Sequence, residues 1–200
     1  MADRELDFQS VYDSFHPRIN RYLTRLVGQS EADDLTQEVF VKVSRGLSDF
    51  RGDAKLSTWV YRIATNVAMD RLRSMSAGPA ISKTSVSEEG KAFEDRDLWT
   101  GEKKPSMDRQ MIREEMSECV HEFIDRLPES YRAVVLLSEV EGLKNREIAE
   151  VLGISLDTVK IRLHRGRSKL KEELESGCSF DRDEKDVLVC DRKEPTEESS

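Results

Sequence analysis

Basic side chains concentrate in one short segment of the chain, and their density suits contact with an anionic polymer. Residues 154–171 hold six Lys or Arg and one acidic residue, a local charge of +5. Such side chains donate hydrogen bonds to the phosphate oxygens of nucleic acids. The whole chain carries a net charge of −8, but residues 172–200 hold 11 acidic and four basic side chains and contribute −7 of it. The local field therefore favours DNA in spite of the acidic total.

The basic segment includes the turn of a predicted helix-turn-helix. Ala149 allows two helices to approach closely, Gly153 suits a left-handed turn, and Ser155 can cap the following helix. In the helix that follows, the spacing of apolar residues predicts that they share one buried face. The remaining side chains then lie on the outer face, which can enter the major groove of DNA. The residues predicted to contact duplex DNA, at base edges or phosphates, are Ser155, Asp157, Thr158, Lys160, Ile161, Arg162, His164, Arg165, Arg167 and Lys169. The alternative is a helical hairpin with a solvated basic face.

A second polar group lies on a helix predicted from about residue 55. Arg62, Asn66, Met69 and Arg73 follow one another at spacings of four, three and four, which places them on one helix face. The two arginines can hold the phosphates of a strand, while the Asn66 amide offers both a donor and an acceptor to a base. Trp59 could stack on a base, but its alignment with Ile63 and Val67 favours packing in the core.

A third group is acidic and begins the helix predicted over residues 31–47. Its members are Asp33, Asp34, Gln37 and Glu38. The simplest interpretation of this group is structural: its carboxylates lie near the positive N-terminal end of the helix, which they stabilise, and they face solvent. A divalent cation for nuclease chemistry is a further alternative, since carboxylates four residues apart share a helix face. No basic catalytic partner or phosphate-binding glycine loop accompanies them, so we do not expect an enzyme.

Helical periodicity predicts the elements that carry these groups. The first body, residues 1–76, contains helices over 6–27, 31–47 and from 55, and Pro17 predicts a kink or a break in the first of them. Residues 77–107 have no sustained period and predict a flexible linker. The second body, residues 108–174, contains helices over 108–126, 129–140, 145–152 and 156–174, and an acidic tail covers 175–200. The fold class is therefore all-α, with two small helical domains.

Composition excludes several other classes of protein. Aromatic residues at 6 %, ten Gly and five Pro do not suit a many-turned β-sandwich. The longest apolar run, residues 133–137, is far shorter than the roughly 20 residues that cross a bilayer. The first residues are charged where a signal peptide would be apolar. We expect a cytoplasmic protein that does not insert in membranes.

Two cysteines in the tail raise a separate hypothesis. The segment from Cys178 to Cys190 is symmetric about Glu184, so a turn at residues 183–185 would form a β-hairpin in which the two cysteines lie opposite each other. Opposed residues in a hairpin are within disulfide reach. The thiols could then form a disulfide under oxidation or share a soft metal; otherwise no cofactor is expected. The alternatives are a disordered acidic tail and an inhibitory tail that covers the basic helix.

Five motifs in order along the chain resemble the extracytoplasmic-function subfamily of bacterial RNA polymerase sigma factors. The resemblance covers about residues 6–174 without the predicted linker. Its motifs are DDLTQEVF at 33–40, FRGD at 50–53, STWVYRIATN at 57–66, LPESYR at 127–132 and TVKIRLHRGR at 158–167. By this resemblance the first body is region 2 and the second is region 4, while region 3 is absent. The tail departs from the subfamily pattern.

The resemblance implies a function for each polar group. It assigns contact with the polymerase to Asp33, Asp34, Gln37, Glu38 and Phe40. The resemblance assigns contact with the melted strand of the −10 promoter element to two sets of residues. These are Phe50, Arg51, Gly52 and Lys55 in the loop, and Arg62, Asn66 and Arg73 on the following helix. The helix-turn-helix reads the −35 element as duplex. The implied partners are core RNA polymerase, promoter DNA and an anti-sigma factor, and the rival interpretation is a helix-turn-helix regulator that binds duplex DNA without polymerase.

The inhibitory interpretation of the tail predicts a gain of DNA binding on truncation. If the acidic tail covers the basic helix, deleting residues 176–200 tightens binding of the free chain to duplex DNA, because the net charge of −4 on the deleted residues no longer competes with phosphates. Titration of a labelled duplex with both chains at equal salt measures the change. Unchanged affinity would exclude an inhibitory tail.

Overall fold

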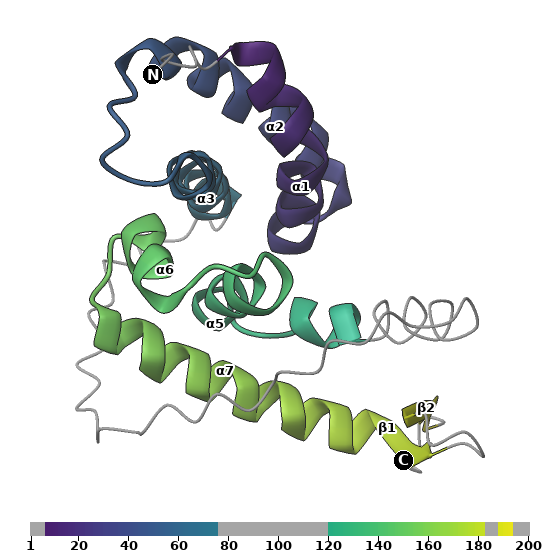
Figure 1. Ribbon diagram of the computed structural model, residues 1–200. Coiled ribbons are helices and arrows are strands. Elements are labelled where there is room, and N and C mark those ends of the chain that lie inside the picture. Colours follow the sequence, from purple (N-terminus) through teal and green to yellow (C-terminus); the bar gives the residue numbers. More distant parts are fainter. Residues whose placement is uncertain (1–6, 76–119, 183–187, 194–200) are drawn as a thin grey trace.

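The computed structural model describes residues 7–75, 120–182 and 188–193 (Figure 1). Its first helices are α1 (Phe8–Val27), α2 (Gln29–Gly46) and α3 (Leu56–Met75), with the short 3-10 helix η1 (Leu47–Asp49) after α2. A helical turn over residues 120–125 precedes α5 (Glu129–Val135), the π-helix η2 (Leu136–Val140), α6 (Asn145–Leu152) and α7 (Leu156–Gly177). The predicted linker, 77–107, and the predicted helix start at residue 108 lie outside the described residues.

The first helix begins where the sequence offers a cap and continues through its proline. The Asp7 side chain accepts a hydrogen bond from the backbone N–H of Ser10, which satisfies one donor of the first turn. Helix α1 is continuous through Pro17, so the predicted break is wrong. The proline removes one backbone hydrogen bond, while Val11, Ile19 and Leu23 on the same helix remain fully buried. Packing of this apolar face therefore outweighs the lost bond.

Helix α3 buries Val67 as the sequence predicts, but its most buried residues also include some outside the line of Trp59, Ile63 and Val67. Tyr61, Ala64 and Ala68 are fully buried, whereas Trp59 and Ile63 are only partly covered. The Tyr22 and Tyr61 rings meet edge to face with centroids 5.5 Å apart, and the Tyr22 hydroxyl lies 3.0 Å from that of Thr65. Small residues on α3 thus allow α1 and α2 to pack closely around two buried tyrosines.

The helix-turn-helix forms as predicted. Gly153 adopts the left-handed conformation (φ 63°, ψ 35°) at the end of α6, and the Ser155 side chain accepts a hydrogen bond from the backbone N–H of Thr158 at the start of α7. Gly166 on α7 lies against α5, where a Cβ atom would be 2.7 Å from Val135 Cγ2. The long helix α7 therefore crosses α5 at a point where no side chain fits between them.

The two bodies pack against each other and share one core, a contact that the sequence analysis does not predict. Buried residues of α1, α2 and α3 form a continuous cluster with those of α5, α6 and α7. In Figure 1, α6 lies between α3 and α7. Arg132 donates to the backbone oxygen of Leu26 at 3.3 Å, and Arg25 lies 3.6 Å from the Asp125 carboxylate. Polar contacts thus accompany the apolar ones across this boundary.

The predicted tail hairpin is present, but its predicted register is wrong. Strands β1 (Cys178–Arg182) and β2 (Leu188–Arg192) pair antiparallel, with Cys178 opposite Arg192 and Phe180 opposite Cys190. The connection covers five residues, 183–187, where the prediction placed a three-residue turn, and this shifts the partners by two positions. The redox or metal hypothesis for Cys178 and Cys190 therefore loses the opposed pair on which it depends, and it stays a prediction.

The close approach of α7 to α5 predicts a stability loss when volume is added at Gly166. Gly166→Ala places a methyl group 2.7 Å from Val135 Cγ2, so we expect the free energy of unfolding to fall by about 1–3 kcal/mol in spite of the better helix propensity of Ala. Urea unfolding followed by circular dichroism measures the loss. Glu172→Ala, at an exposed position of the same helix, is the control. Equal midpoints for the two variants would contradict the close contact.

Candidate nucleic-acid interface

The outer face of α7 presents polar side chains beside a buried stripe. Val159, Leu163 and Gly166 are buried, as predicted. The predicted duplex contacts that are exposed are Ser155, Asp157, Lys160, His164, Arg165, Arg167 and Lys169. Thr158, Ile161 and Arg162 are half-buried at the edge of this face. Because the buried stripe holds α7 on α5, the exposed face is presented on a rigid element, as groove reading requires.

Several of the predicted contacts on α7 already have partners within the chain. The Arg167 guanidinium donates to Glu139 Oε1 through Nη2 at 2.7 Å and through Nε at 3.0 Å. The Ser155 hydroxyl caps α7 and lies 2.8 Å from the Thr158 hydroxyl. The Arg167 pair is exposed, so exchange of Glu139 for a phosphate costs little. Ser155 has a structural role in forming the first turn.

The predicted strand-binding face of α3 is open to solvent. Arg62, Asn66 and Arg73 are exposed along one side of the helix, while Met69 packs against the core. Arg73 donates to Asp70 Oδ1 at 2.7 Å, an exposed pair within one helical turn. A strand lying along this face would meet a guanidinium at each end and a carboxamide between them. The order of groups suits a backbone contact on both sides of one base.

The loop before α3 contains the other predicted strand contacts. The Phe50 and Trp59 rings pack with centroids 5.3 Å apart, Gly52 has a φ of 76°, and Arg51 is exposed. Lys55 Nζ lies 2.6 Å from Glu147 Oε1 on α6. The hydrogen bond from Lys55, with a second from the backbone N–H of Lys144, lowers the pKa of the Glu147 carboxyl. The loop therefore touches the helix-turn-helix unit directly.

A cleft of about 490 Å³ separates this loop and α3 from α6. Its walls contain the polar side chains of Asp53, Thr58, Arg62 and Glu150 and the ring of Trp59. Thr58 is buried, and its hydroxyl has no hydrogen-bond partner among the described residues. The loop, α3 and α6 thus form one candidate binding region.

The acidic patch on α2 is exposed, but the aromatic residue assigned to it is not. Asp33, Asp34, Gln37 and Glu38 are all exposed, with Asn20 donating to Asp33 Oδ1 at 2.8 Å. Phe40 is 3 % exposed, because its ring packs edge-on against Tyr12 at 4.8 Å. The structure therefore brings the four polar residues together and places Phe40 in the wall of a neighbouring groove.

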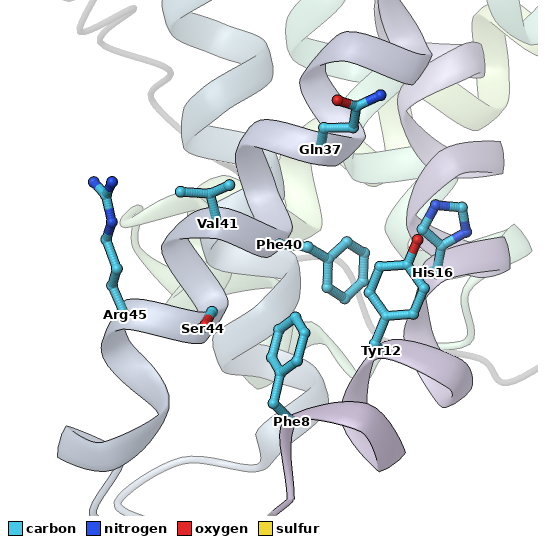
Figure 2. A pocket seen from close by; sticks show the side chains of 8 residues that line it. All are labelled: Phe8, Tyr12, His16, Gln37, Phe40, Val41, Ser44 and Arg45. Carbon is cyan, nitrogen blue, oxygen red and sulfur yellow. The ribbon is translucent and has the colours of Figure 1, made fainter.

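That groove lies between α1 and α2 (Figure 2). It has a volume of about 430 Å³ and a mostly apolar lining of Phe8, Tyr12, His16, Gln37, Phe40, Val41, Ser44 and Arg45. Val41 is 47 % exposed, an unusual exposure for a large apolar residue in the described part of the chain. An apolar groove beside an acidic patch suits a helix of a partner protein that has basic and apolar side chains.

Sequence reasoning missed the polar cluster that joins the two bodies. Glu141 follows η2, its side chain is 2 % exposed, and Arg18 Nη2 lies 3.3 Å from its Oε2. The Tyr61 hydroxyl donates to the same Oε2. Burial and this carboxylate raise the pKa of the Tyr61 hydroxyl, so it remains a donor. In the sequence, Glu141 only marks the break before Gly142, and no motif signals its burial.

Two negative findings limit the chemistry of the described residues. Within ranges 7–75, 120–182 and 188–193, no group of three or more His, Cys, Asp or Glu side chains could hold a metal ion. No helix in the same ranges has the length and apolarity of a membrane span. Asp33, Asp34 and Glu38 therefore do not gather as a metal-binding group.

Comparisons with known proteins match both bodies. Residues 11–77 match the family model described as Sigma-70 region 2, and residues 117–170 match Sigma-70, region 4. RNA polymerase sigma factor SigZ of Bacillus subtilis is 33 % identical over 179 residues, 89 % of this chain and 93 % of its own. ECF RNA polymerase sigma factor SigW of the same species is 32 % identical, over 84 % of this chain and 88 % of its own. RNA polymerase sigma-H factor of Pseudomonas aeruginosa is 37 % identical, over 72 % and 74 %.

Solved structures share the fold at lower identity. The sigma factor RpoE of Bartonella quintana, in complex with the anti-sigma factor NepR, has a TM-score of 0.60 at 20 % identity and covers 84 % of this chain and 97 % of its own. CnrH, in complex with the cytosolic domain of CnrY, has a TM-score of 0.56 at 23 % identity, with 84 % and 88 % covered. These likenesses extend over both bodies of the chain.

The contact between Lys55 and Glu147 predicts a pH-dependent contribution to stability. A lowered carboxyl pKa stabilises the fold above the ordinary value of 4.5, and this contribution disappears as the pH falls below the pKa in the folded state. Glu147→Gln should therefore lower the free energy of unfolding by about 0.5–1 kcal/mol at pH 7 and by much less at pH 3. Urea unfolding at both pH values tests this. Glu172→Gln is the exposed control, and an equal loss at the two pH values would contradict the ionic contact.

Proposed function

Because this chain belongs to the extracytoplasmic-function sigma factors of the sigma-70 family, it directs RNA polymerase to promoters, and we propose how its surfaces divide that work. The observation that carries the proposal is the separation of three exposed faces on α2, α3 and α7, in the two regions that match the family models. Each face has the side chains that one partner requires.

The −35 element is read as duplex by α7. Lys160, His164 and Arg165 project from the exposed side of the helix, close to its N-terminal half, where a recognition helix meets base edges. Lys169 and Arg167 lie one to two turns further along and contact phosphates, with Arg167 released from Glu139. The remaining predicted residues of this helix support the contact from its edge or through the Ser155 cap.

The −10 element is read as a melted strand by α3 and the loop before it. Arg62 and Arg73 hold phosphates on either side of Asn66, which contacts a base. The loop residues Phe50, Arg51, Gly52 and Lys55 lie at the mouth of the same region. An extruded base costs a few kcal/mol in lost stacking, so contacts of this kind are needed to hold it.

Core RNA polymerase binds the acidic patch and the groove beside it. Asp33, Asp34, Gln37 and Glu38 supply the polar contacts, while Phe40 shapes the groove wall and Val41 supplies exposed apolar area. An anti-sigma factor is the second protein partner, since RpoE of Bartonella quintana binds one in a complex of the same fold. Work on promoters requires a cytoplasmic location.

Sigma factors are DNA-binding initiation factors and not catalysts, and we propose no catalytic activity for this chain. A free-standing helix-turn-helix regulator is not favoured, because such a protein needs neither region 2 nor exposed faces on α2 and α3. The tail cysteines Cys178 and Cys190 are not needed for any of these steps.

Transcription from core polymerase tests the proposal and separates its two DNA contacts. The template is a promoter selected by sequencing DNA bound to the reconstituted holoenzyme. We expect run-off transcript only when the chain is added, since a regulator cannot make core enzyme promoter-specific. Arg165→Ala should lower holoenzyme binding to closed duplex by about 1–3 kcal/mol, which is roughly 5- to 150-fold. Arg62→Ala should bind closed duplex normally but lower permanganate reactivity at the −10 element.

Lys171→Ala is the matched control for these variants. It removes one positive charge from an exposed position of α7 outside the proposed contacts, where Lys171 lies 3.6 Å from Glu175. Its transcription should equal that of the unchanged chain. A loss as large as that of Arg165→Ala would mean that total charge, and not the proposed face, determines binding. Failure of the chain to bind core polymerase at micromolar concentration would contradict the proposed function as a whole.

A further inference from the structure

We infer that Asn20 on α1 is a positioning residue for the polymerase contact: its carboxamide holds the carboxylate of Asp33 in the orientation in which core RNA polymerase binds it. This role rests on the proposed function and concerns how the acidic patch on α2 is presented. Asn20 lies outside the five motifs that resemble the family, so none of them accounts for its side chain. Two hydrogen bonds from α1 to α2 assign it the role.

The amide nitrogen of Asn20 bonds to two acceptors on α2. Asn20 Nδ2 donates to Asp33 Oδ1 at 2.8 Å and to Thr36 Oγ1 at 3.3 Å. An ionised carboxylate only accepts hydrogen bonds, so the nitrogen of the carboxamide, and not its oxygen, must face Asp33. The amide has two N–H groups, and the two acceptors use both of them. Helix α2 therefore fixes the orientation of the Asn20 side chain.

A buried threonine anchors this pair of hydrogen bonds. Thr36 is 1 % exposed, and its hydroxyl donates to the backbone oxygen of Ala32 at 2.7 Å. That bond uses the single hydroxyl proton, so the Thr36 oxygen acts as an acceptor toward Asn20. Ile19, the neighbour of Asn20 on α1, is fully buried. The hydrogen bonds thus tie the Asp33 side chain to the packed interface between α1 and α2.

The bond to Asn20 leaves one side of the Asp33 carboxylate open to a partner. Asp33 is exposed, and within the described parts of the chain its second oxygen, Oδ2, has no hydrogen-bond partner. A carboxylate has about four lone-pair positions, so it can bind a basic group of the polymerase in addition to Asn20. A side chain that is already held in one orientation loses less conformational freedom on binding. Asn20 therefore lowers the entropic cost of the polymerase contact.

The neighbouring carboxylates of α2 are held in other ways. Glu38, also in the acidic patch, pairs with Lys42 at 3.0 Å one turn along the same helix, and both side chains are about half-exposed. Arg71 of α3 donates to Glu31 at 2.6 Å, but Glu31 lies outside the patch. Among the described residues, Asp33 is thus the patch member whose carboxylate is hydrogen-bonded to a side chain of another helix.

Binding of the full-length chain to core RNA polymerase tests the positioning role. We expect Asn20→Ala to raise the Kd about three- to tenfold, because Asp33 must then be ordered during binding. Asp33→Ala should raise the Kd at least as much, since the contact itself is lost. Gln9→Ala is the matched control, because it removes an exposed amide-to-carboxylate bond on the same helix, 2.8 Å from Gln9 Nε2 to Asp13 Oδ1. Its Kd should stay within about twofold of that of the unchanged chain.

A double-mutant cycle separates positioning from a direct contact and from a general loss of structure. When Asp33 is already alanine, the further change Asn20→Ala should alter the Kd by no more than about twofold, because the residue that it positions is gone. An unchanged Kd for Asn20→Ala alone would overturn the inference, and so would an undiminished loss on top of Asp33→Ala. If Asp33→Ala itself leaves the Kd unchanged, the proposed polymerase contact of Asp33 fails, and the positioning role fails with it.

Asn20→Asp distinguishes orientation from total charge. This nearly isosteric variant adds a negative charge beside the acidic patch, but its new carboxylate cannot donate to Asp33. If only the acidity of the patch mattered, a basic partner would bind the variant more tightly. We expect the Kd to rise at least as much as in Asn20→Ala, because two adjacent carboxylates repel each other. Tighter binding than that of the unchanged chain would overturn the inference.

Discussion

One buried carboxylate connects the two halves of this protein. Glu141 lies directly after a π-helical segment whose backbone hydrogen bond runs from Glu141 N–H to the oxygen of Leu136 at 3.0 Å. It receives donors from two helices of the other body, and the apolar clusters of both bodies meet around it. Because a charged group is costly to bury, it requires this specific alignment of α1, α3 and the end of η2. Together with the shared apolar core, this contact holds the second body against α1 and α3.

The same alignment of the two bodies explains why the proposed binding faces differ in their exposure to solvent. The exposed face of α7, the acidic patch on α2 and most of the α3 face are open to solvent. The loop before α3 is the exception, because Lys55 is paired with Glu147 and the adjoining cleft is walled by α6. The proposed surfaces for polymerase and duplex are thus exposed in this structure, while the proposed surface for the melted strand is partly covered by α6. This difference in exposure fits a protein that binds polymerase before it binds the melted strand of a promoter.

Local sequence signals succeeded where the physical cause is local. The cap at Ser155, the left-handed Gly153 and the bounds of α6 depend on residues within one or two turns, and they are as predicted. The exposure of Arg62, Asn66 and Arg73 follows from helical spacing alone. Two predictions failed, one because tertiary packing outweighs a local signal and one because the length of a turn was misjudged. Helix α1 continues through Pro17, and the hairpin register depends on a five-residue connection that symmetry about Glu184 did not reveal.

The sequence by itself determined the helical class, the helix-turn-helix, the family resemblance and the three polar groups, because helix periodicity, capping and turn residues act over short distances. Only the tertiary structure decided that the two bodies share a core, that Phe40 is a wall residue and that Glu141 is buried against Arg18 and Tyr61. Glu141 is 123 positions from Arg18 and 80 positions from Tyr61 in the sequence, and no periodic pattern encodes a contact over such a separation. Side-chain packing and the cost of burying one charge determine it instead.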